Sequence, residues 1–219
     1  MKALIYGASA QGRVILDILR EENRYASIEF VDDNKELWGQ ELNGARIIGD
    51  LERVLQSVSP PFEMVIAVGH PVLRMRLAQK ARERSVQFAN AVHPSASLMR
   101  SATIGVGNMI SALASVNSGA RLGNHLIVNT AAVVEHDCVL EDYATVCPGV
   151  QLGGRSHVGT GAFVATGAIV LPRISIGDGA VVAAGSIVTK PVPERVVVVG
   201  APARIHSRVD ESFDWRRLL

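Results

Sequence analysis

The sequence predicts an N-terminal α/β domain with a small Rossmann-like parallel sheet, followed by a left-handed parallel β-helix of about five coils. Up to residue 93, strand-like and helix-like segments alternate, which is typical of a parallel sheet with flanking helices. From residue 94 the helical pattern stops, and an aliphatic residue returns at every sixth position. We therefore divide the chain into a first domain at 1–93, a β-helix domain at 94–206 and a C-terminal tail at 207–219.

The first domain is expected to alternate about four strands with three helices. The strand-like segments are 2–7, 27–33, 64–69 and 88–94, and the helix-like segments are 11–22, 51–57 and 72–84. Such an order places parallel strands side by side with helices packed against them. A dinucleotide-binding fold, in which Asp32 would grip a ribose, is a rival interpretation. About four strands are too few for the two halves of that fold.

The second domain is built on an unbroken six-residue repeat. Sixteen consecutive sixth positions, from Leu98 to Val188, are aliphatic, and small residues recur two positions before them. One such unit cannot bury its aliphatic side chain alone, whereas three units form a triangular coil and stacked coils form a continuous core. Flat-sided prisms of this kind associate side by side, so we expect a homotrimer with ligand clefts between subunits.

The charge balance and the cysteine content narrow the classes of partner. The 22 Lys and Arg residues nearly cancel the 21 Asp and Glu residues, so no strong field directs the protein to nucleic acid or to a membrane surface. Cys138 and Cys147 form no CxxC pair and are expected as free thiols in a reducing compartment. No apolar run approaches the roughly 18 residues needed to cross a bilayer. We therefore expect a cytoplasmic protein that binds small molecules and copies of itself.

Six short motifs occur in order along the chain. They are GASAQG from Gly7, VDD at Asp32 and Asp33, AVGHPVLR ending at Arg74, HPSA from His93, NTAAVVEHDC at 129–138 and VGAPAR ending at Arg204. Together they resemble the sialic-acid O-acetyltransferase-like family of sugar acyltransferases, which is a hexapeptide-repeat family. That family includes bacterial N-acetyltransferases of nucleotide-linked 4-amino-sugars of the bacillosamine and perosamine type. The resemblance covers nearly the whole chain, to about residue 204.

The resemblance implies an acetyl-CoA-dependent N-acetyltransferase in bacterial glycan biosynthesis, acting on a 4-amino-sugar linked to UDP, GDP or dTDP. An O-acetyltransferase acting on a sialic-acid-like sugar is the nearest alternative, and a non-catalytic β-helix scaffold or nucleotide-sugar sensor is a third. An intact pair of His136 and Asp137 argues against the scaffold. Many relatives have histidines where this chain has Gln11 and Thr145, which leaves open the sugar and the choice of amine or hydroxyl.

His136 is the expected general base. Acetyl transfer needs a group that takes a proton from the nucleophile as it attacks the thioester, and a histidine suits this role near neutral pH. His136 follows the inward Val134 by two residues, so it should emerge at a corner of the prism. Asp137 beside it could fix the imidazole tautomer and stabilise the imidazolium. The resemblance assigns these two residues the same roles and implies that Asn129 and Glu135 contact the substrate.

The glycine turn between the first strand and the first helix is the expected phosphate site. It places residues 7–12 at a helix N-terminus, where backbone N–H groups favour anions. The resemblance implies a nucleotide-sugar as the ligand of this domain. The residues expected to bind it are Gly7, Ser9, Gln11, Asp32, Asp33, Lys35, Gly69, His70 and Arg74.

Acetyl-CoA is expected along a groove of the prism. By resemblance, its pantetheine contacts backbone groups near Gly154, Thr166 and Ala184, and the VGAPAR segment lies near its adenine. The N–H of Gly154 could also face the thioester oxygen, where negative charge develops. The full set expected at the acetyl-CoA site is Thr145, Gly154, Thr166, Gly167, Ala184, Ala201 and Pro202. The sequence has no Cys and His cluster with zinc-ligand spacing, so we expect no metal.

Overall fold

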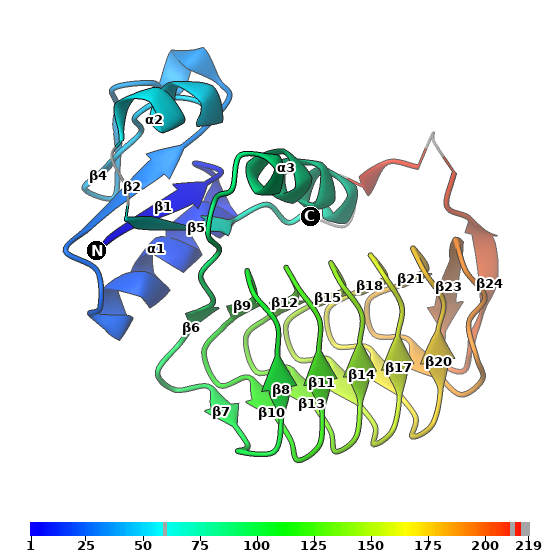
Figure 1. Ribbon diagram of the computed structural model, residues 1–219. Helices are drawn as coiled ribbons and strands as arrows, with labels where there is room; N and C mark the ends of the chain where they lie inside the picture. Colours follow the sequence, from blue (N-terminus) through cyan, green and yellow to red (C-terminus); the bar gives the residue numbers. More distant parts are fainter. Residues whose placement is uncertain (59–60, 211–212, 216–219) are drawn as a thin grey trace.

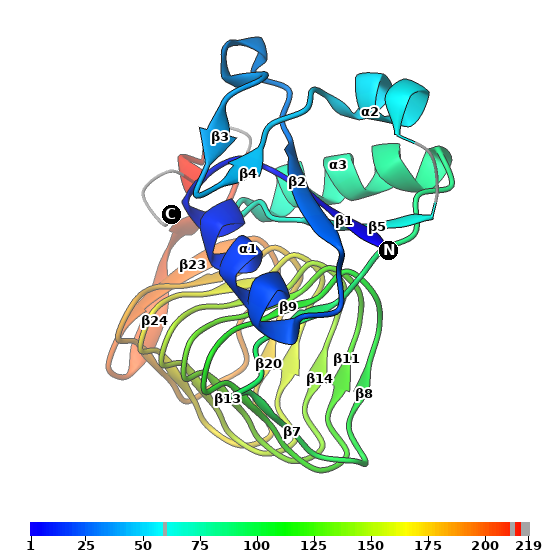
Figure 2. The same cartoon turned by 90° about the vertical axis from the view of Figure 1, so that its left-hand side faces the viewer.

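The computed structural model describes residues 1–58, 61–210 and 213–215. An N-terminal α/β domain lies against one side of an elongated triangular prism, the β-helix (Figure 1). Figure 2 looks along the prism, so that the coils lie one behind another below the N-terminal domain. The predicted combination of a small parallel sheet with a β-helix is confirmed.

Three parallel strands in the order β2-β1-β5 form the sheet of the N-terminal domain. The strands are β1 Lys2–Tyr6, β2 Ser27–Val31 and β5 Phe62–Ile66, and the helices are α1 Ala10–Glu22, α2 Leu51–Ser57 and α3 Pro71–Glu83. The central strand β1 buries every residue from Ala3 to Tyr6, as expected for a parallel strand covered on both faces. Across the described ranges, no helix combines the length and the apolar content needed to cross a membrane.

The described part of this sheet has three strands, whereas the sequence suggested about four. The segment 88–94 gives the sheet one isolated bridge, between Phe88 and Met64, and then enters the β-helix as β6 (Ala91–Val92). A second difference is an insertion before α2, which forms the short helix η1 (Lys35–Leu37) and the hairpin of β3 (Glu41–Leu42) and β4 (Ala45–Arg46). Its few apolar residues are scattered among polar ones, so no hydrophobic period marks it in the sequence.

The β-helix consists mainly of two-residue strands joined by four-residue turns, and each strand from β6 to β19 pairs with the strand 18 residues further along. The docking face, which carries the N-terminal domain, contains β6 Ala91–Val92, β9 Met109–Ile110, β12 Ile127–Val128, β15 Thr145–Val146, β18 Phe163–Val164, β21 Val181–Val182, β23 Val196–Gly200 and β24 Ala203–Arg208. The open face contains β7 Ser97–Leu98, β10 Ser115–Val116, β13 Val133–Val134, β16 Gln151–Leu152, β19 Ile169–Val170 and β22 Ile187–Val188. The third face contains β8 Thr103–Ile104, β11 Arg121–Leu122, β14 Val139–Leu140, β17 His157–Val158 and β20 Ser175–Ile176.

The β-helix is longer than the roughly five coils expected, because the three faces contain eight, six and five strands in the described chain. The repeat begins one unit before the counted run, since Val92 precedes Leu98 by six residues and β6 pairs with β9. At the other end, β23 pairs with β21 and continues the docking face. The stacked aliphatic residues form one core along the whole prism.

The docking face is distinguished by its outward side chains. The first residue of each two-residue strand points away from the prism core, and on the docking face these residues are all buried. They are Ala91, Met109, Ile127, Thr145, Phe163 and Val181. At the same position on the other faces, Gln151 and Arg121 are exposed. Helix α1 covers part of the docking face, where its Ile15 and Leu19 belong to one cluster with Met109.

Arg74 of α3 locks the N-terminal domain to the β-helix. It is fully buried, and its five N–H groups meet five acceptors at 2.7–2.9 Å. These acceptors are the carbonyl oxygens of Val68, Gly69, His125 and Tyr143 and the hydroxyl oxygen of Thr145. Burial lowers the pKa of Arg74 to about 9, which still leaves it charged at neutral pH.

This contact corrects two expectations from the sequence. Arg74 has no N–H group left for a phosphate, so its expected contact with the nucleotide is wrong. Thr145, expected at the acetyl-CoA site, is 3% exposed because it lies on the docking face beneath α3. Both residues therefore hold the two parts of the chain together instead of contacting a ligand.

His125 lies in the same interface. Its ring stacks on Tyr143 and meets Phe88 edge-on, with centroid separations of 5.3 and 4.5 Å. Neither ring nitrogen has a hydrogen-bond partner in the described chain, and burial lowers the pKa of His125 to about 4. The residue occupies a turn that faces the other domain, so the neutral ring is closed to substrates.

The tail from residue 207 is described only in part, because residues 211, 212 and 216–219 lie outside the described ranges. Strand β24 ends at Arg208, and Phe213 and Trp215 pack against the β-helix core. The Trp215 ring lies 5.3 Å from the His70 ring and 6.1 Å from the Phe163 ring between centroids. The described tail residues therefore extend the cover of the docking face beyond α3.

We expect Arg74→Ala to lower the free energy of unfolding by about 3–5 kcal/mol, because it leaves several buried carbonyl groups without a donor. Arg76→Ala, on the exposed side of the same helix, should change it by less than about 0.5 kcal/mol. Urea unfolding of the two variants measures the difference. An Arg74→Ala protein that is as stable as the parent would contradict the role of Arg74 in joining the domains.

Candidate active site

A histidine, a carboxylate and an arginine meet on one edge of the prism. This His136 edge lies between the open face and the third face and includes the turn 135–138 between β13 and β14. Nδ1 of His136 lies 3.0 Å from Oδ2 of Asp137, and Nε of Arg155 lies 3.4 Å from the same oxygen. The hydrogen bonds from His136 and Arg155 lower the pKa of Asp137. The carboxylate is therefore charged beside the imidazole at neutral pH.

This arrangement leaves Nε2 of His136 free to take a proton. Because Nδ1 donates to the carboxylate, the neutral imidazole carries its lone pair on Nε2. Nε2 has no hydrogen-bond partner in the part of the chain that the structure describes, and the side chain is 56% exposed. The pair of His136 and Asp137 thus has the geometry of a general base with its orienting carboxylate.

Gly154 lies against this imidazole, one coil further along the prism. A Cβ atom at residue 154 would lie 2.5 Å from Nε2 of His136, closer than side-chain atoms approach in real structures. The backbone N–H of Gly154 has no acceptor among the described residues. The absence of a side chain therefore leaves room for the ring and leaves a free N–H donor next to it.

Glu135 and Asn129, which are expected by resemblance to contact the substrate, lie on different edges. Glu135 adjoins the histidine, and its Oε2 accepts a hydrogen bond from the backbone N–H of His136 at 3.2 Å. Asn129 lies between the docking face and the open face, where its Oδ1 accepts from the backbone N–H of Thr130 at 2.8 Å. One protomer therefore brings Glu135, but not Asn129, to the candidate base.

Most of the residues expected at the acetyl-CoA site gather on the edge that contains Asn129, which we call the Thr166 edge. It includes the turns 129–132, 147–150, 165–168 and 183–186. A hydrogen bond of 3.1 Å from the N–H of Gly200 to Oγ of Ser186 holds the β23–β24 hairpin against this edge. The exposed residues of the expected set found here are Thr166, Gly167, Ala184, Ala201 and Pro202. Gly154 is separated from them by the width of the open face.

The glycine turn lies between β1 and α1, at the carboxyl edge of the sheet. Gly7 has a φ of 116°, and a Cβ atom there would lie 2.9 Å from the carbonyl oxygen of Ala67. Ser9 is the N-cap of α1 but makes no capping hydrogen bond through its side chain. The first turn of α1 therefore keeps backbone N–H groups that no side chain of the turn occupies.

Two carboxylates follow β2 next to this turn. Oδ2 of Asp32 accepts a hydrogen bond from the N–H of Ala8 at 2.8 Å, so Asp32 fixes the turn itself. Oδ1 of Asp33 accepts from the hydroxyl of Tyr6 at 2.7 Å, and burial together with this hydrogen bond raises the pKa of Tyr6. Asp33 and Lys35 are exposed and remain accessible to a ligand.

Gly69 and His70 complete the carboxyl edge of the sheet after β5. His70 is the N-cap of α3, where its Nδ1 accepts from the N–H of Leu73 at 3.3 Å, and burial lowers the pKa of its ring. Gln11 faces the β-helix instead, with Nε2 3.9 Å from the sulfur of Met109. The structure thus places the expected nucleotide-sugar residues, apart from Arg74 and Gln11, on or beside one edge.

Two residues of these sites were missed in the sequence. Arg155 contacts Asp137, and it follows Asp137 by 18 residues, so the repeat already placed it one coil above. Trp38 lies beside the glycine turn, because its Nε1 donates to the carbonyl oxygen of Asp32 at 2.8 Å. No periodic signal marks Trp38, which belongs to the insertion after β2.

The carboxyl edge of the sheet and the candidate base lie on opposite sides of a protomer. The N-terminal domain covers the docking face, and the His136 edge joins the two other faces (Figure 2). In a triangular prism this edge is the one opposite the docking face. A ligand bound at the glycine turn is therefore separated from the His136 of its own protomer by the prism.

Comparisons with known proteins cover both parts of the chain. Residues 2–81 match the PglD N-terminal domain family, and residues 167–190 match the hexapeptide repeat of succinyl-transferase. Among curated proteins, GDP-perosamine N-acetyltransferase of Escherichia coli O157:H7 is 29% identical over 172 residues, or 76% of each chain.

Solved structures are similar over nearly the whole length. The acetyltransferase domain of PglB from Neisseria gonorrhoeae FA1090, in complex with acetyl coenzyme A, is 32% identical with a TM-score of 0.89, covering 94% of this chain and 98% of that one. PerB from Caulobacter crescentus, in complex with CoA and GDP-perosamine, is 30% identical with a TM-score of 0.88, also covering 94% and 98%. Both relatives share the combination of domains and not only the β-helix.

We expect Gly154→Ala to displace the His136 ring from Asp137, because the new methyl group would lie 2.5 Å from Nε2, closer than the two atoms can approach. Since the ring is exposed it can move aside, and the free energy of unfolding should fall by less than about 1 kcal/mol. NMR signals of the His136 ring, assigned by their loss in His136→Gln, report the displacement. Gln151→Ala, on the neighbouring open face, is the control that should leave them unchanged. Unchanged ring signals in Gly154→Ala would contradict the packing described.

Proposed function

The chain belongs to the hexapeptide-repeat sugar N-acetyltransferases that carry a PglD N-terminal domain, and we propose that it transfers the acetyl group of acetyl-CoA to the amine of a nucleotide-linked 4-amino-sugar. The relatives supply the substrate class, because PerB is bound to CoA and GDP-perosamine and the PglB domain to acetyl coenzyme A. The observation that carries the proposal is the exposed His136 imidazole, with Nδ1 held by Asp137 and Nε2 without a partner.

His136 is the proposed general base of the transfer. Its Nε2 takes a proton from the amine as the nitrogen attacks the thioester carbonyl, and the Asp137 carboxylate stabilises the imidazolium that forms. The free N–H of Gly154 donates to the thioester oxygen, on which negative charge develops. As the carbon–sulfur bond breaks, the imidazolium returns its proton to the departing thiolate. His136 is then neutral again and ready for the next substrate.

The two substrates are proposed to occupy different parts of the chain. The N-terminal turn of α1, with Gly7 and Ser9, favours the diphosphate, because its N–H groups and the helix dipole attract negative charge. Asp33 and Lys35 are exposed beside this turn and would contact the nucleoside. The Thr166 edge would hold the pantetheine and adenine of acetyl-CoA, with the β23–β24 hairpin as its outer wall.

We propose that the complete site forms between protomers of a homotrimer. The base is opposite the domain that would hold its substrate, and the expected acetyl-CoA residues are divided between the His136 edge and the Thr166 edge. A neighbouring prism could set its Thr166 edge beside the His136 edge. This arrangement would bring the base to the nucleotide-sugar domain of the neighbour and would unite the two groups of acetyl-CoA residues. Ile169 on the open face and Leu171 on the His136 edge are 39% and 40% exposed, and association would cover this apolar surface.

A cytoplasmic location remains part of the proposal. Cys138 and Cys147 are both unpaired and buried, and burial raises the pKa of each thiol, that of Cys147 to about 12. Unpaired thiols are typical of proteins from reducing compartments.

We expect His136→Ala to lower kcat by about 100-fold to 10,000-fold, the usual contribution of a general base, with little change in the KM for acetyl-CoA. Asp137→Asn should cause a smaller loss, because the base is present but less well oriented. His157→Ala is the matched control, since His157 pairs with Glu141 at 3.1 Å on the third face and has no proposed role. Release of CoA measured with a thiol reagent gives the rates. A folded His136→Ala enzyme that keeps more than about a third of parental turnover would exclude this base.

We expect mixed trimers of His136→Ala and Asp33→Ala subunits to regain activity that neither variant has alone. If the base and the nucleotide domain of one site come from different subunits, one of the three sites in each mixed trimer, or about a third, contains both intact residues. Co-expression with two affinity tags isolates the mixed species for assay. Absence of any recovered activity would place both residues of a site in the same subunit.

A further inference from the structure

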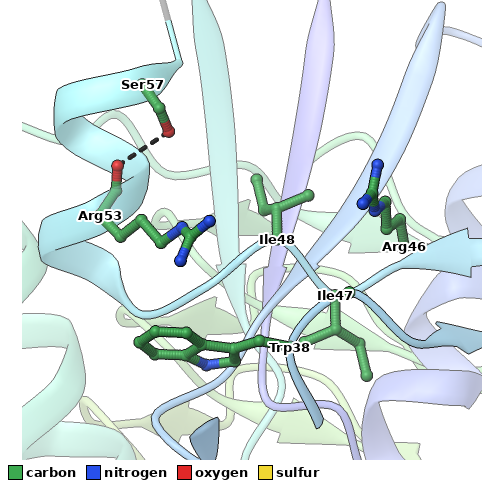
Figure 3. A pocket seen from close by; sticks show the side chains of 7 residues that line it. Trp38, Arg46, Ile47, Ile48, Arg53 and Ser57 are labelled. Atoms are coloured by element: carbon green, nitrogen blue, oxygen red, sulfur yellow. Dashed lines mark hydrogen bonds between the residues drawn. The ribbon is translucent and has the colours of Figure 1, made fainter.

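A pocket of about 390 Å³ lies beyond β2, at the outer edge of the sheet. It is lined by Trp38, Gly39, Arg46, Ile47, Ile48, Arg53 and Ser57. Figure 3 shows the indole of Trp38 on one side of this space, Arg53 reaching over it from α2 and Arg46 on the far side of Ile48. Its volume is within the range of about 300–1,000 Å³ that small-molecule sites occupy.

The side chains around this pocket offer positive charge and hydrogen-bond donors. The Arg53 guanidinium lies 5.3 Å from the centroid of the Trp38 ring, and Nζ of Lys35 lies 5.8 Å from it. In the chain as far as it is described, no carboxylate forms an ion pair with Lys35, Arg46 or Arg53. Arginine and lysine side chains have no acceptor atoms. The pocket therefore suits a flat group whose edge carries acceptors.

The pocket adjoins the residues proposed to hold the nucleotide-sugar and extends from them along the outer edge of the sheet, where Ile47 bridges Phe30. At the carboxyl edge the strands follow the order β5, β1, β2, so that His70, the glycine turn and Asp32 succeed one another. Trp38 comes next, because its Nε1 donates to the carbonyl oxygen of Asp32, whose side chain accepts from Ala8 in the glycine turn. Two hydrogen bonds of 2.8 Å thus link the indole to the proposed diphosphate site.

Resting on the proposed function, we propose that this pocket is the nucleobase subsite and that it selects guanine, so that GDP carries the 4-amino-sugar. With the diphosphate at the glycine turn and the ribose beside Asp32 and Asp33, the base reaches the pocket. The planes of Trp38 and Arg53 hold the flat base by stacking. Arg46 then donates to the edge of the base.

Guanine is the base whose edge matches a group of donors. Its O6 and N7 atoms are adjacent acceptors, which one arginine contacts with two N–H groups at once. Adenine presents a donor next to N7, and no lysine or arginine of the pocket can accept from it. Uracil and thymine offer only O4 at the corresponding edge, so the arginine fork makes one contact instead of two.

The test is titration calorimetry of the full chain with GDP, ADP, UDP and dTDP. We expect the parent to bind GDP at least tenfold more tightly than the other three nucleotides. Arg46→Gln should weaken the binding of GDP by about 5-fold to 150-fold, which is the effect of one bidentate contact to a base. The affinity for UDP should change by less than about twofold. Arg46→Lys, which keeps the charge but not the fork, should also lose the preference for GDP. Arg121→Gln, an exposed arginine on the third face, is the charge-matched control and should bind as the parent does.

Two results would overturn the guanine assignment alone. One is equal or tighter binding of UDP or dTDP by the parent, and the other is a preference for GDP that survives in Arg46→Gln. The proposed function stands in both cases, because a nucleotide still binds. If none of the four nucleotides binds at millimolar concentration to protein with the parental melting temperature, the nucleotide-sugar function and the pocket assignment fail together. Arg46 is exposed, so its variants are expected to fold.

Discussion

The 18-residue register of the β-helix is the constraint on which the rest of the structure depends. Each coil contains three six-residue units, so every residue stands about 4.8 Å from the residue 18 positions earlier. The core follows from this spacing, since Val134 and Leu152 belong to one aliphatic column. The candidate base follows from it as well, because Gly154 stands one coil above His136 and leaves room for its ring. A slip of one residue would turn the aliphatic column outward and part the histidine from its glycine in the same step. Stability and site geometry are thus set by a single constraint.

The contact between the domains uses the same register. Nε and Nη2 of Arg74 donate to the carbonyl oxygens of His125 and Tyr143, which are 18 residues apart and therefore lie on adjacent coils. One guanidinium spans the rise of one coil, so α3 is tied to two coils through their backbone. The buried charge is balanced by carbonyl dipoles instead of a carboxylate. Burial of a charged group costs free energy unless each of its hydrogen bonds is made. This requirement favours one placement of the domain on the prism.

The parts of the structure that the sequence predicted are those that follow a period or a local motif. The six-residue repeat located the prism core, the alternating segments located α1 to α3, and the motif around His136 predicted the contact of this candidate base with Asp137. The role of Arg74 could not be predicted in this way, because an arginine after a glycine turn can donate hydrogen bonds to a phosphate or to carbonyl groups equally well. Its burial depends on how two domains dock. A signal for that docking was present, since the outward residues on one face, such as Met109, Ile127 and Phe163, are apolar at 18-residue spacing. Read at that spacing, the sequence would also have placed Thr145 under the N-terminal domain.

The two proposed substrate sites stand under unequal structural constraints. Residues of the His136 edge are fixed by the register, so a change that shifts one coil alters the core and the site together. The insertion from Lys35 to Arg46 lies outside the β-helix and outside the three strands of the sheet. Its strands β3 and β4 pair with each other, and Arg20 of α1 donates to the carbonyl oxygen of Asn43 in their turn. Trp38 is attached to this frame through the backbone carbonyl of Asp32, which every residue type would supply. The side chains around the indole can therefore change without moving the glycine turn or the base. The proposed recognition of the nucleoside is in this way separated from acetyl transfer, and on this proposal the carrier preference depends on a segment whose exchange leaves the geometry of His136 and Asp137 intact.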